Sequence, residues 1–387
     1  MPKRVAIVGW AQTRHERRKT LDNDWDLIYP TVKAALKDAG LRHDDIDVCL
    51  EGASDYLDGR GISNYTIVDG VGGQLKEEAK VSMDAAYAFI YAAQRLLTGP
   101  FEVAIVSGYG KGSESVEFHW QTNTLFDPFY GQPLGLDALS AAGLQASAYF
   151  NRFGISEEQA ALVPVKNKRN ALRNPNAQVK KNLTVEQVMK SPPLCKPIKR
   201  EDACPISDGA AALVLATEER AKKICRKAGH KPVWLLGMGH CQEAFSLGAR
   251  DLTFARAGQL AAKRAFQMAR IRHPLQELDV AEVYEPFGFQ ELMWYEALGF
   301  CPPGQGAAIL EKRVTEMGGR LPVNPSGGAL AANPMLATGL VRIIEAAAQV
   351  AGRAGKMQVK KRVRRALAAA TNGVALQNCA VFVLGGS

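Results

Sequence analysis

Four segments of the sequence combine side chains suited to acid–base or nucleophilic chemistry with helix starts or glycines that could position them. The first is KVSMDAAYAFIYAAQRLLTG, residues 80–99. Ser82 and Asp84 stand at the start of an apolar helix, where free backbone N–H groups and the helix dipole favour a negatively charged oxygen. Either residue could instead simply cap the helix, and this segment by itself favours capping.

The second segment is DVAEVYEPFGFQELMWYEALGFC, residues 279–301. Tyr284 lies at the carboxyl end of a predicted strand, which is where ligands of open α/β sheets bind. Its phenol can donate a hydrogen bond or, if its pKa is lowered, act as a base. The alternative is a core tyrosine with a satisfied hydroxyl. Cys301 is the one cysteine that we expect near such a segment, but its place after a helix makes it a poor nucleophile.

The third segment is GGRLPVNPSGGALAANPMLATG, residues 318–339. Its glycines and prolines predict a loop with special backbone angles, and a helix begins near its end. The polar side chains of this loop are those of Asn324, Ser326 and Asn333. Binding of an anion or a carbonyl group is therefore plausible, although glycine-rich loops are common.

The fourth segment is TNGVALQNCAVFVLGG, residues 371–386. Asn372 and Gly373 precede the last predicted strand, and a turn of this kind can present backbone N–H groups to an oxyanion. Cys379 falls inside the strand pattern, which predicts a core position.

No histidine falls in these four segments, so neither a histidine base nor a Ser–His–Asp or Cys–His arrangement is predicted. The cysteines are scattered without a CxxC spacing, which supports neither a zinc site nor a disulfide framework. We expect reduced thiols and no metal. The histidines are His15, His43, His119, His230, His240 and His273, and the cysteines are Cys49, Cys195, Cys204, Cys225, Cys241, Cys301 and Cys379.

The elements that must position these segments alternate between short apolar strands and helices, which favours parallel βαβ units in an α/β fold. A segment of about 113–197, rich in Asn, Pro and Lys, interrupts this alternation and predicts an inserted lobe. We expect an N-terminal half over residues 1–228 and a C-terminal half over 232–387. The strands DGAAALVLAT and NGVALQNCAVFVLGG close the two halves similarly, which indicates an internal duplication. The expected strands are 5–9, 45–51, 103–108, 210–216, 233–237, 279–284 and 379–384, and the expected helices are 25–39, 81–97, 157–172, 218–228, 260–270, 290–298 and 337–352.

Composition sets the class of protein. The chain has 387 residues, of which 47% are hydrophobic and 22% charged, as in ordinary soluble globular proteins. No apolar run is long enough for a membrane span and no signal peptide is evident, so a cytoplasmic protein is expected. The net charge is +9, with a basic cluster at 360–365. No nucleic-acid-binding motif accompanies it, so we expect an anionic small molecule, an acidic protein partner or simply a solvated face.

Several long motifs resemble the thiolase superfamily, and specifically the sterol-carrier-type thiolases. They are VAIVGWAQTR, YFNRFGISEEQAALVPVKNKRNALRNPNAQ, CPISDGAAALVLATEERA and LPVNPSGGALAANPMLATGLVRIIEAAAQVAG. The resemblance covers nearly the whole chain. It implies a five-layered αβαβα fold of two duplicated halves with an inserted loop domain, and at least a dimer. It also implies CoA thioesters as substrates, within lipid or aromatic acid metabolism. CoA then enters as part of the substrate, and no covalently bound cofactor is expected.

The chain departs from this family at every catalytic side chain. Ser82 falls where the family has its nucleophilic cysteine, and Tyr284 where it has asparagine or histidine. Asn333 replaces the histidine of the Gly-His-Pro motif, and Asn372 falls near the second catalytic cysteine. A cysteine thiolate is available near neutral pH, whereas a serine needs an adjoining base. We therefore do not expect an acyl-enzyme on Ser82.

The resemblance leaves a route without a covalent step. Backbone N–H groups near Asp84 and Gly373, with Ser326 as a substrate-binding residue, could hold a thioester enolate, and Tyr284 could act as acid or base in a retro-aldol reaction. Steroid side-chain aldolases are thiolase relatives that lack the cysteine and use tyrosine. Tyr284 matches one such tyrosine, but Asn333 does not match the second.

Three functions remain open at this stage. We slightly favour a C–C lyase acting on a β-hydroxyacyl-CoA. The alternatives are a thiolase or acyl-CoA C-acyltransferase in the strict sense, which cleaves a 3-ketoacyl-CoA, and a non-catalytic thiolase-like subunit of a complex. By analogy with the cysteine-less relatives, we expect a homodimer core and a small partner protein with an OB-fold and a zinc ribbon, and neither nucleic acid nor membrane as a partner.

Overall fold

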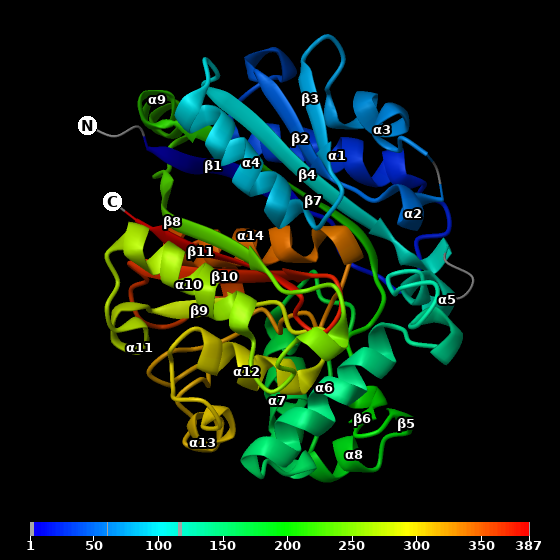
Figure 1. The fold of residues 1–387 in the computed structure, drawn as a ribbon. Coiled ribbons are helices and arrows are strands. Elements are labelled where there is room, and N and C mark those ends of the chain that lie inside the picture. The colour runs from blue at the N-terminus through cyan, green and yellow to red at the C-terminus, as the bar shows by residue number, and fades with distance from the viewer. Residues whose placement is uncertain (1–3, 60, 115–117, 387) are drawn as a thin grey trace.

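The structure is a computed structural model that describes residues 4–59, 61–114 and 118–386 (Figure 1). Its strands form a large mixed sheet in the order β3-β2-β4-β7-β1-β8-β11-β10-β9, together with the small hairpin β5-β6. The strands are β1 Val5–Gln12, β2 Val48–Gly52, β3 Glu77–Val81, β4 Val103–Lys111, β5 Pro193–Cys195, β6 Ile198–Lys199, β7 Asp208–Thr217, β8 Val233–Gln242, β9 Val280–Val283, β10 Arg365–Asn372 and β11 Asn378–Gly385.

The large sheet consists of two halves with the same strand order. The first half is β3-β2-β4-β7-β1, and the second is β9-β10-β11-β8, which repeats the pattern without the outermost strand. At that outer position the second half has only an isolated parallel bridge between Ala281 and Val323. The two halves join through two paired residues of β1 and β8, Ala6 with Trp234 and Ile7 with Val233. This arrangement confirms the expected duplication.

Strand direction differs from the expectation of parallel units. β2 pairs in parallel with β3 and β4, and β9 with β10. However, β7 runs antiparallel to both β1 and β4, and β11 runs antiparallel to both β8 and β10. Each half is therefore a mixed sheet, because only some of the connections between neighbouring strands are helical crossovers. Strands β3 and β10 were not predicted.

The helices arrange the sheet halves into layers. α4 and α14 lie between the two halves, α1 and α9 cover the outer face of the first half, and α10 covers the outer face of the second (Figure 1). This is the five-layered αβαβα fold that the resemblance implied. The helices are α1 Asp24–Ala39, α2 Asp55–Asp58, α3 Asn64–Val71, α4 Ala85–Thr98, α5 Phe118–Asn123, α6 Ala138–Phe153, α7 Glu157–Asn170, α8 Val185–Met189, α9 Glu218–Ala228, α10 Arg256–Ala269, α11 Pro274–Glu277, α12 Gly288–Ala297, α13 Gly306–Glu311 and α14 Thr338–Ala351.

The central position of α4 explains its sequence. A helix between two sheets has no solvent face along most of its length, so it is apolar nearly all round, and Ala88, Phe89 and Ala92 are fully buried. Phe89 packs edge-on against Phe382 of β11, which joins the central layer to the second half. The helix begins at Ala85 rather than at Val81, because Val81 ends β3 and Asp84 is the N-cap.

The segment between β4 and β7 carries α5 to α8 and the β5-β6 hairpin. Its helix α7 packs against α12 and α13 of the second half, so the insertion covers the C-terminal part of the molecule (Figure 1). The divisions at residues 113–197 and 228–232 stay predictions. In the described part of the chain, no helix has both the length and the apolar character needed to cross a membrane.

The close packing of α10 on β8, on the outer face of the second half-sheet, can be tested by substitution. A Cβ atom added at Gly237 would lie 2.1 Å from the carbonyl oxygen of Ala265. Because backbone atoms cannot move aside, Gly237→Ala is expected to lower the free energy of unfolding by about 1–3 kcal/mol, measured by urea denaturation. Gly318→Ala is the matched control, since nothing lies within 4 Å of its Cβ position. Equal unfolding midpoints for the two variants would contradict this packing.

Candidate active site

Four of the polar residues singled out in the sequence meet at one edge of the second half-sheet, namely Tyr284, Asn333, Asp84 and Asn372. Because β9 and β10 are parallel, their carboxyl ends lie side by side, with Val283 opposite Ala369. Tyr284 follows β9 directly, and its backbone N–H bonds to the carbonyl of Ala369 at 3.0 Å. Asn372 ends β10. The first turns of α4 and α14 approach the same edge.

Tyr284 and Asn333 are directly bonded. The Tyr284 hydroxyl donates to Asn333 Oδ1 at 2.8 Å, and the Thr338 hydroxyl donates to the same oxygen at 2.7 Å. Two hydroxyl donors on one atom orient the amide, so that its nitrogen faces the other way. That nitrogen donates to the sulfur of Cys204 at 3.1 Å. Asn333 is thus bonded on both sides and fixes the direction of the Tyr284 hydroxyl.

Cys204 was not anticipated at this place, and Cys301, the cysteine expected near the site, is not among the hydrogen-bond partners of Tyr284 or Asn333 in the described residues. Cys204 lies in the CPISDG stretch that leads into β7. The sequence carries no sign that this stretch lies next to the loop around Asn333, and Cys204 was therefore missed. Burial raises the pKa of the Cys204 thiol to about 12, and Glu285, when it is ionised, raises it further. Cys204 is therefore a neutral thiol and an acceptor for the amide of Asn333.

Asp84 joins the starts of the two central helices. Its carboxylate accepts a hydrogen bond from the N–H of Ala86 in α4 and another from the N–H of Gly339 in α14, both at 2.8 Å. Its own N–H lies 3.4 Å from the side-chain oxygen of Asn372. Only 1% of Asp84 is exposed. The capping interpretation is therefore correct for Asp84, and the same carboxylate also lies at the site.

Burial sets the protonation of both ionisable groups at the site. Burial raises the pKa of Asp84 to about 7, although backbone N–H donors and the charge of Arg342 oppose this. The pKa of Tyr284 lies well above its usual value of 10, mainly because of burial and next because of the negative charge of Asp84. At neutral pH the phenol therefore keeps its proton, whereas Asp84 can lose its own. This excludes tyrosinate as the resting form.

Ser82 differs from its expected neighbours. It is exposed in the turn between β3 and α4, and its hydroxyl has no hydrogen bond among the described residues. No base therefore adjoins it. Gly373, with φ of 76°, follows Asn372 in the turn between β10 and β11. Of the helix-start N–H groups proposed as an oxyanion site, that of Ala86 is already bonded to Asp84.

Backbone strain collects in the two loops that flank the site. Four residues other than glycine have positive φ there, namely Asn324 (52°), Met335 (45°), Ala375 (50°) and Leu376 (53°). Side-chain residues rarely adopt such angles, and strain of this kind persists where the surrounding structure holds it. Asn324 illustrates this, because its side-chain oxygen accepts the N–H of Val283 at 2.8 Å.

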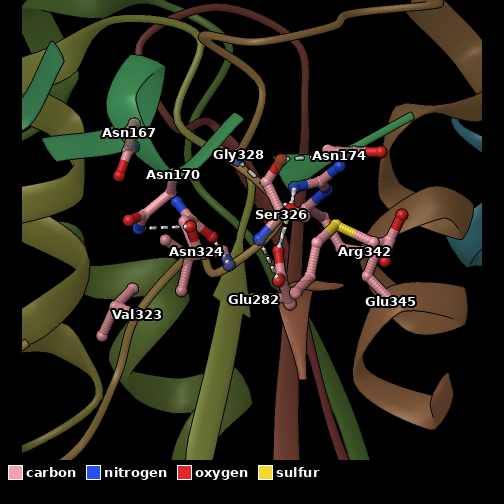
Figure 2. Close-up of polar contacts among 12 residues, drawn as sticks. Asn167, Asn170, Asn174, Glu282, Val323, Asn324, Ser326, Gly328, Arg342 and Glu345 are labelled. Carbon is pink, nitrogen blue, oxygen red and sulfur yellow. Dashed lines mark hydrogen bonds and ion pairs between the residues drawn. The ribbon is translucent and has the colours of Figure 1, made fainter. Parts of the chain in front are cut away.

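Ser326 lies in a buried ionic network beneath the loop (Figure 2). Its hydroxyl donates to Glu282 Oε2 at 2.6 Å, and its N–H donates to Glu282 Oε1 at 3.0 Å. Arg342 of α14 bonds both the Ser326 hydroxyl, at 2.8 Å, and Glu282 Oε2, at 3.0 Å. The hydroxyl is thus committed to holding the loop between β9 and α14, which leaves its expected substrate-binding role without structural support.

A second buried network lies behind Tyr284. Lys166 of α7 pairs with Glu291 of α12 at 2.9 Å, and Asn324 Nδ2 bonds both Glu291, at 2.7 Å, and Glu285, at 2.9 Å. One cation thus faces two carboxylates. Burial and the charge of Glu291 raise the pKa of Glu285 to about 8, so Glu285 holds a proton at neutral pH and the network stays near charge balance.

The histidines stay outside the site. Among the described residues, none of them hydrogen-bonds with Tyr284, Asn333, Asp84 or Asn372. The same part of the chain contains no group of three His, Cys, Asp or Glu side chains arranged to hold a metal ion. The chemistry available at the site is therefore that of a phenol, two amides, a carboxylate and a thiol.

Fold and site together define a thiolase-fold protein. Comparison with known proteins agrees with this class. Residues 239–386 match a thiolase C-terminal domain-like family. Acetyl-CoA acetyltransferase of Methanothermobacter thermautotrophicus is 31% identical over 92% of this chain and 93% of its own length. The benzoylsuccinyl-CoA thiolase subunit BbsB of Thauera aromatica is 27% identical over 96% of both chains. The chain belongs to the thiolase superfamily, in its sterol-carrier-type branch.

Solved structures give the same placement. The structure of the Ltp2-ChsH2(DUF35) aldolase matches with a TM-score of 0.85 and 25% identity, and it covers 99% of this chain and 98% of that one. Human mitochondrial 3-ketoacyl-CoA thiolase matches with a TM-score of 0.74 at 16% identity, over 100% of this chain and 99% of that one, which supports the fold alone.

The ion pair of Glu282 and Arg342 can be tested by substitution. Arg342→Met leaves a buried carboxylate without its cation, so the free energy of unfolding is expected to fall by about 3–5 kcal/mol. Burial already raises the pKa of Glu282 to about 7, and loss of Arg342 raises it further. A carboxyl group whose pKa is raised in the folded state costs stability as the pH rises towards that pKa. Because the pKa of Glu282 is higher still in Arg342→Met, this loss continues above pH ~7 in the variant. The difference in the free energy of unfolding between the variant and the unaltered protein should therefore grow above pH ~7.

Arg169→Met is the matched control for this variant. Arg169 pairs with Glu316 at the surface, where such pairs contribute about 1 kcal/mol or less. Chemical denaturation at two pH values measures both variants. A deficit for Arg342→Met that is no larger than that of the control would contradict the assigned role.

Proposed function

We propose that the chain cleaves the Cα–Cβ bond of a β-hydroxyacyl-CoA by a retro-aldol reaction, with Asp84 as the proton acceptor and Tyr284 as the proton donor. One observation carries the proposal: a protonated phenol and a carboxylate with a pKa of about 7 share one buried cluster where the family has its nucleophile and base. Groups whose protonation differs at working pH are suited to acid and base roles.

The steps balance without a cofactor. Asp84 takes the proton of the β-hydroxyl group, the Cα–Cβ bond breaks, and its electron pair passes to the thioester as an enolate. The β-carbon leaves as an aldehyde or ketone. Tyr284 then protonates the enolate carbon to give the shortened acyl-CoA, and the proton held by Asp84 restores the phenol.

The enolate carries negative charge, and the N-terminal ends of two helices at the site carry partial positive charge that favours it. α4 and α14 both begin there, so their dipoles favour an anion at this place. Asp84 becomes neutral when it takes the proton, which removes the negative charge that would compete with the enolate. The N–H of Gly373 is the donor that we assign to the enolate oxygen.

Two alternatives keep specific support. The acetyltransferase name of the archaeal relative supports thiolysis or acyl transfer, with CoA attacking directly. The subunit named BbsB supports a chain that works as part of a complex, and mutual bonding of Tyr284 and Asn333 is compatible with a silent site. Retro-aldol cleavage is preferred because serine without a base cannot easily form an acyl-enzyme.

Substrate trials separate these functions. Release of an aldehyde or ketone from a β-hydroxyacyl-CoA supports the lyase. Release of acyl-CoA from a 3-ketoacyl-CoA and free CoA supports thiolysis. Silence in both assays, with the co-purified partner present, supports a non-catalytic subunit.

We also propose a homodimer core and a small partner with an OB-fold and a zinc ribbon. The two-component name of the Ltp2-ChsH2(DUF35) aldolase and the subunit name of BbsB support a second chain. Purification under mild conditions followed by mass spectrometry and light scattering is the test, and a lone monomer with full activity would contradict it.

Tyr284→Phe tests the proton donor. The variant keeps the ring, and Asn333 Oδ1 keeps its bond from Thr338, so the fold should remain. Turnover of the β-hydroxyacyl-CoA is expected to fall about a hundredfold or more, the loss typical of general acid–base catalysis. Ser82→Ala is the control and should change turnover little. Near-normal turnover of Tyr284→Phe, or an acyl adduct on Ser82 by mass spectrometry, refutes the mechanism.

The pH profile tests Asp84. Only the ionised carboxylate accepts a proton, so kcat should rise as pH increases through about 7. Asp84→Asn should abolish this rise, whereas Ser82→Ala should keep it. Circular dichroism on both variants separates loss of the base from loss of the fold. A rise that persists in Asp84→Asn shows that another group is the base.

A further inference from the structure

A pocket on the outer side of Cys204 adjoins the candidate active site. It has a volume of about 710 Å³, and its wall includes Arg17, Arg18, Gln178 and Cys204. Cys204 also accepts the hydrogen bond from Asn333, at 3.1 Å. The same side chain therefore forms part of the pocket wall and of the site around Tyr284.

The pocket carries uncommitted positive charge. Arg17 and Arg18 are exposed in the loop after β1, and neither forms an ion pair within the described residues. The acidic side chains near them in the described part of the chain are engaged elsewhere. Glu16 pairs with Arg14 at 3.7 Å, and Glu114 on the pocket wall pairs with Lys111 at 3.2 Å.

Asp208 is likewise unavailable to the two arginines. It is fully buried and accepts hydrogen bonds from the Ser113 hydroxyl at 2.6 Å and from the N–H of Lys19 at 2.9 Å. Two free guanidinium groups on the wall of one pocket favour an anion, because each can bind a carboxylate or phosphate through two parallel hydrogen bonds. Gln178 adds an amide whose oxygen has no hydrogen-bond partner among the described residues.

We propose that this pocket receives the acyl chain of the substrate and that Arg17 and Arg18 bind a carboxylate at the far end of that chain. The substrate class is then a CoA thioester of a dicarboxylic acid. This inference rests on the proposed function for the reaction itself. CoA brings phosphates as another anionic group, but the whole pantetheine arm separates them from the thioester. The pocket, in contrast, begins at the residue that contacts Asn333, so the chain attached to the reacting carbons fits it better.

Binding of unreactive ligands to the full chain tests the proposal. Glutaryl-CoA and valeryl-CoA differ by a terminal carboxylate, and neither has a β-hydroxyl group, so neither is cleaved. By titration calorimetry, glutaryl-CoA should bind about tenfold or more tightly than valeryl-CoA. The double variant Arg17→Gln, Arg18→Gln should lose this preference and leave valeryl-CoA binding unchanged. Arg14→Gln, next to the pocket but not on its wall, is the control.

Two outcomes would overturn the carboxylate assignment. No preference for glutaryl-CoA in the unaltered chain overturns the proposal. The double variant could instead weaken binding of both CoA thioesters equally and leave binding of the corresponding pantetheine thioesters unchanged. That result would assign the arginines to the phosphates of CoA and would also overturn the proposal. Because these are binding measurements, a failure of retro-aldol turnover together with an intact carboxylate preference would refute the proposed reaction and leave the pocket assignment standing.

Discussion

One carboxylate ties the central layer of this molecule together. Asp84 accepts the N–H of Ala86 in α4 and the N–H of Gly339 in α14, so two buried helices from different halves of the chain begin at the same point. A Cβ atom on Gly339 would lie 2.3 Å from Asp84 Oδ1, which shows how closely the two helix starts approach. Everything at the site is arranged around this junction, because β9, β10 and the loop before α14 end at the same edge.

The junction also decides which chemistry the site can perform. In a water-poor cluster a carboxylate is costly to ionise, and burial brings its pKa into the neutral range, while the phenol nearby stays protonated. Ser82, which the sequence predicts at the family's nucleophile position, is exposed, and its hydroxyl has no hydrogen-bond partner among the described residues. A site built this way is better suited to moving protons than to holding an acyl group, and the proposed reaction rests on this difference.

Two buried ionic networks hold the walls of the site. Glu282, Ser326 and Arg342 fix the loop to α14 (Figure 2). Lys166, Glu291 and Asn324 fix it to α7 and α12. The network of Lys166 has one cation and two carboxylates, and the raised pKa of Glu285 relieves the excess negative charge. In the network of Arg342, burial raises the pKa of Glu282. The strained backbone at Asn324 is held by such bonds, and Asn333 follows nine residues later in the same loop.

The sequence by itself determined the alternation of elements, the apolar character of α4, the duplication and the four segments that meet at the site, because these depend on local periodicity and on motifs. It misjudged strand direction and missed β3 and β10. Only the tertiary structure decided that Ser326 bonds Glu282 and Arg342, that Cys204 contacts Asn333, and that Asp84 joins two helices. These contacts link residues far apart in the chain, and protonation follows from their burial. Neither is encoded in the spacing of neighbouring residues.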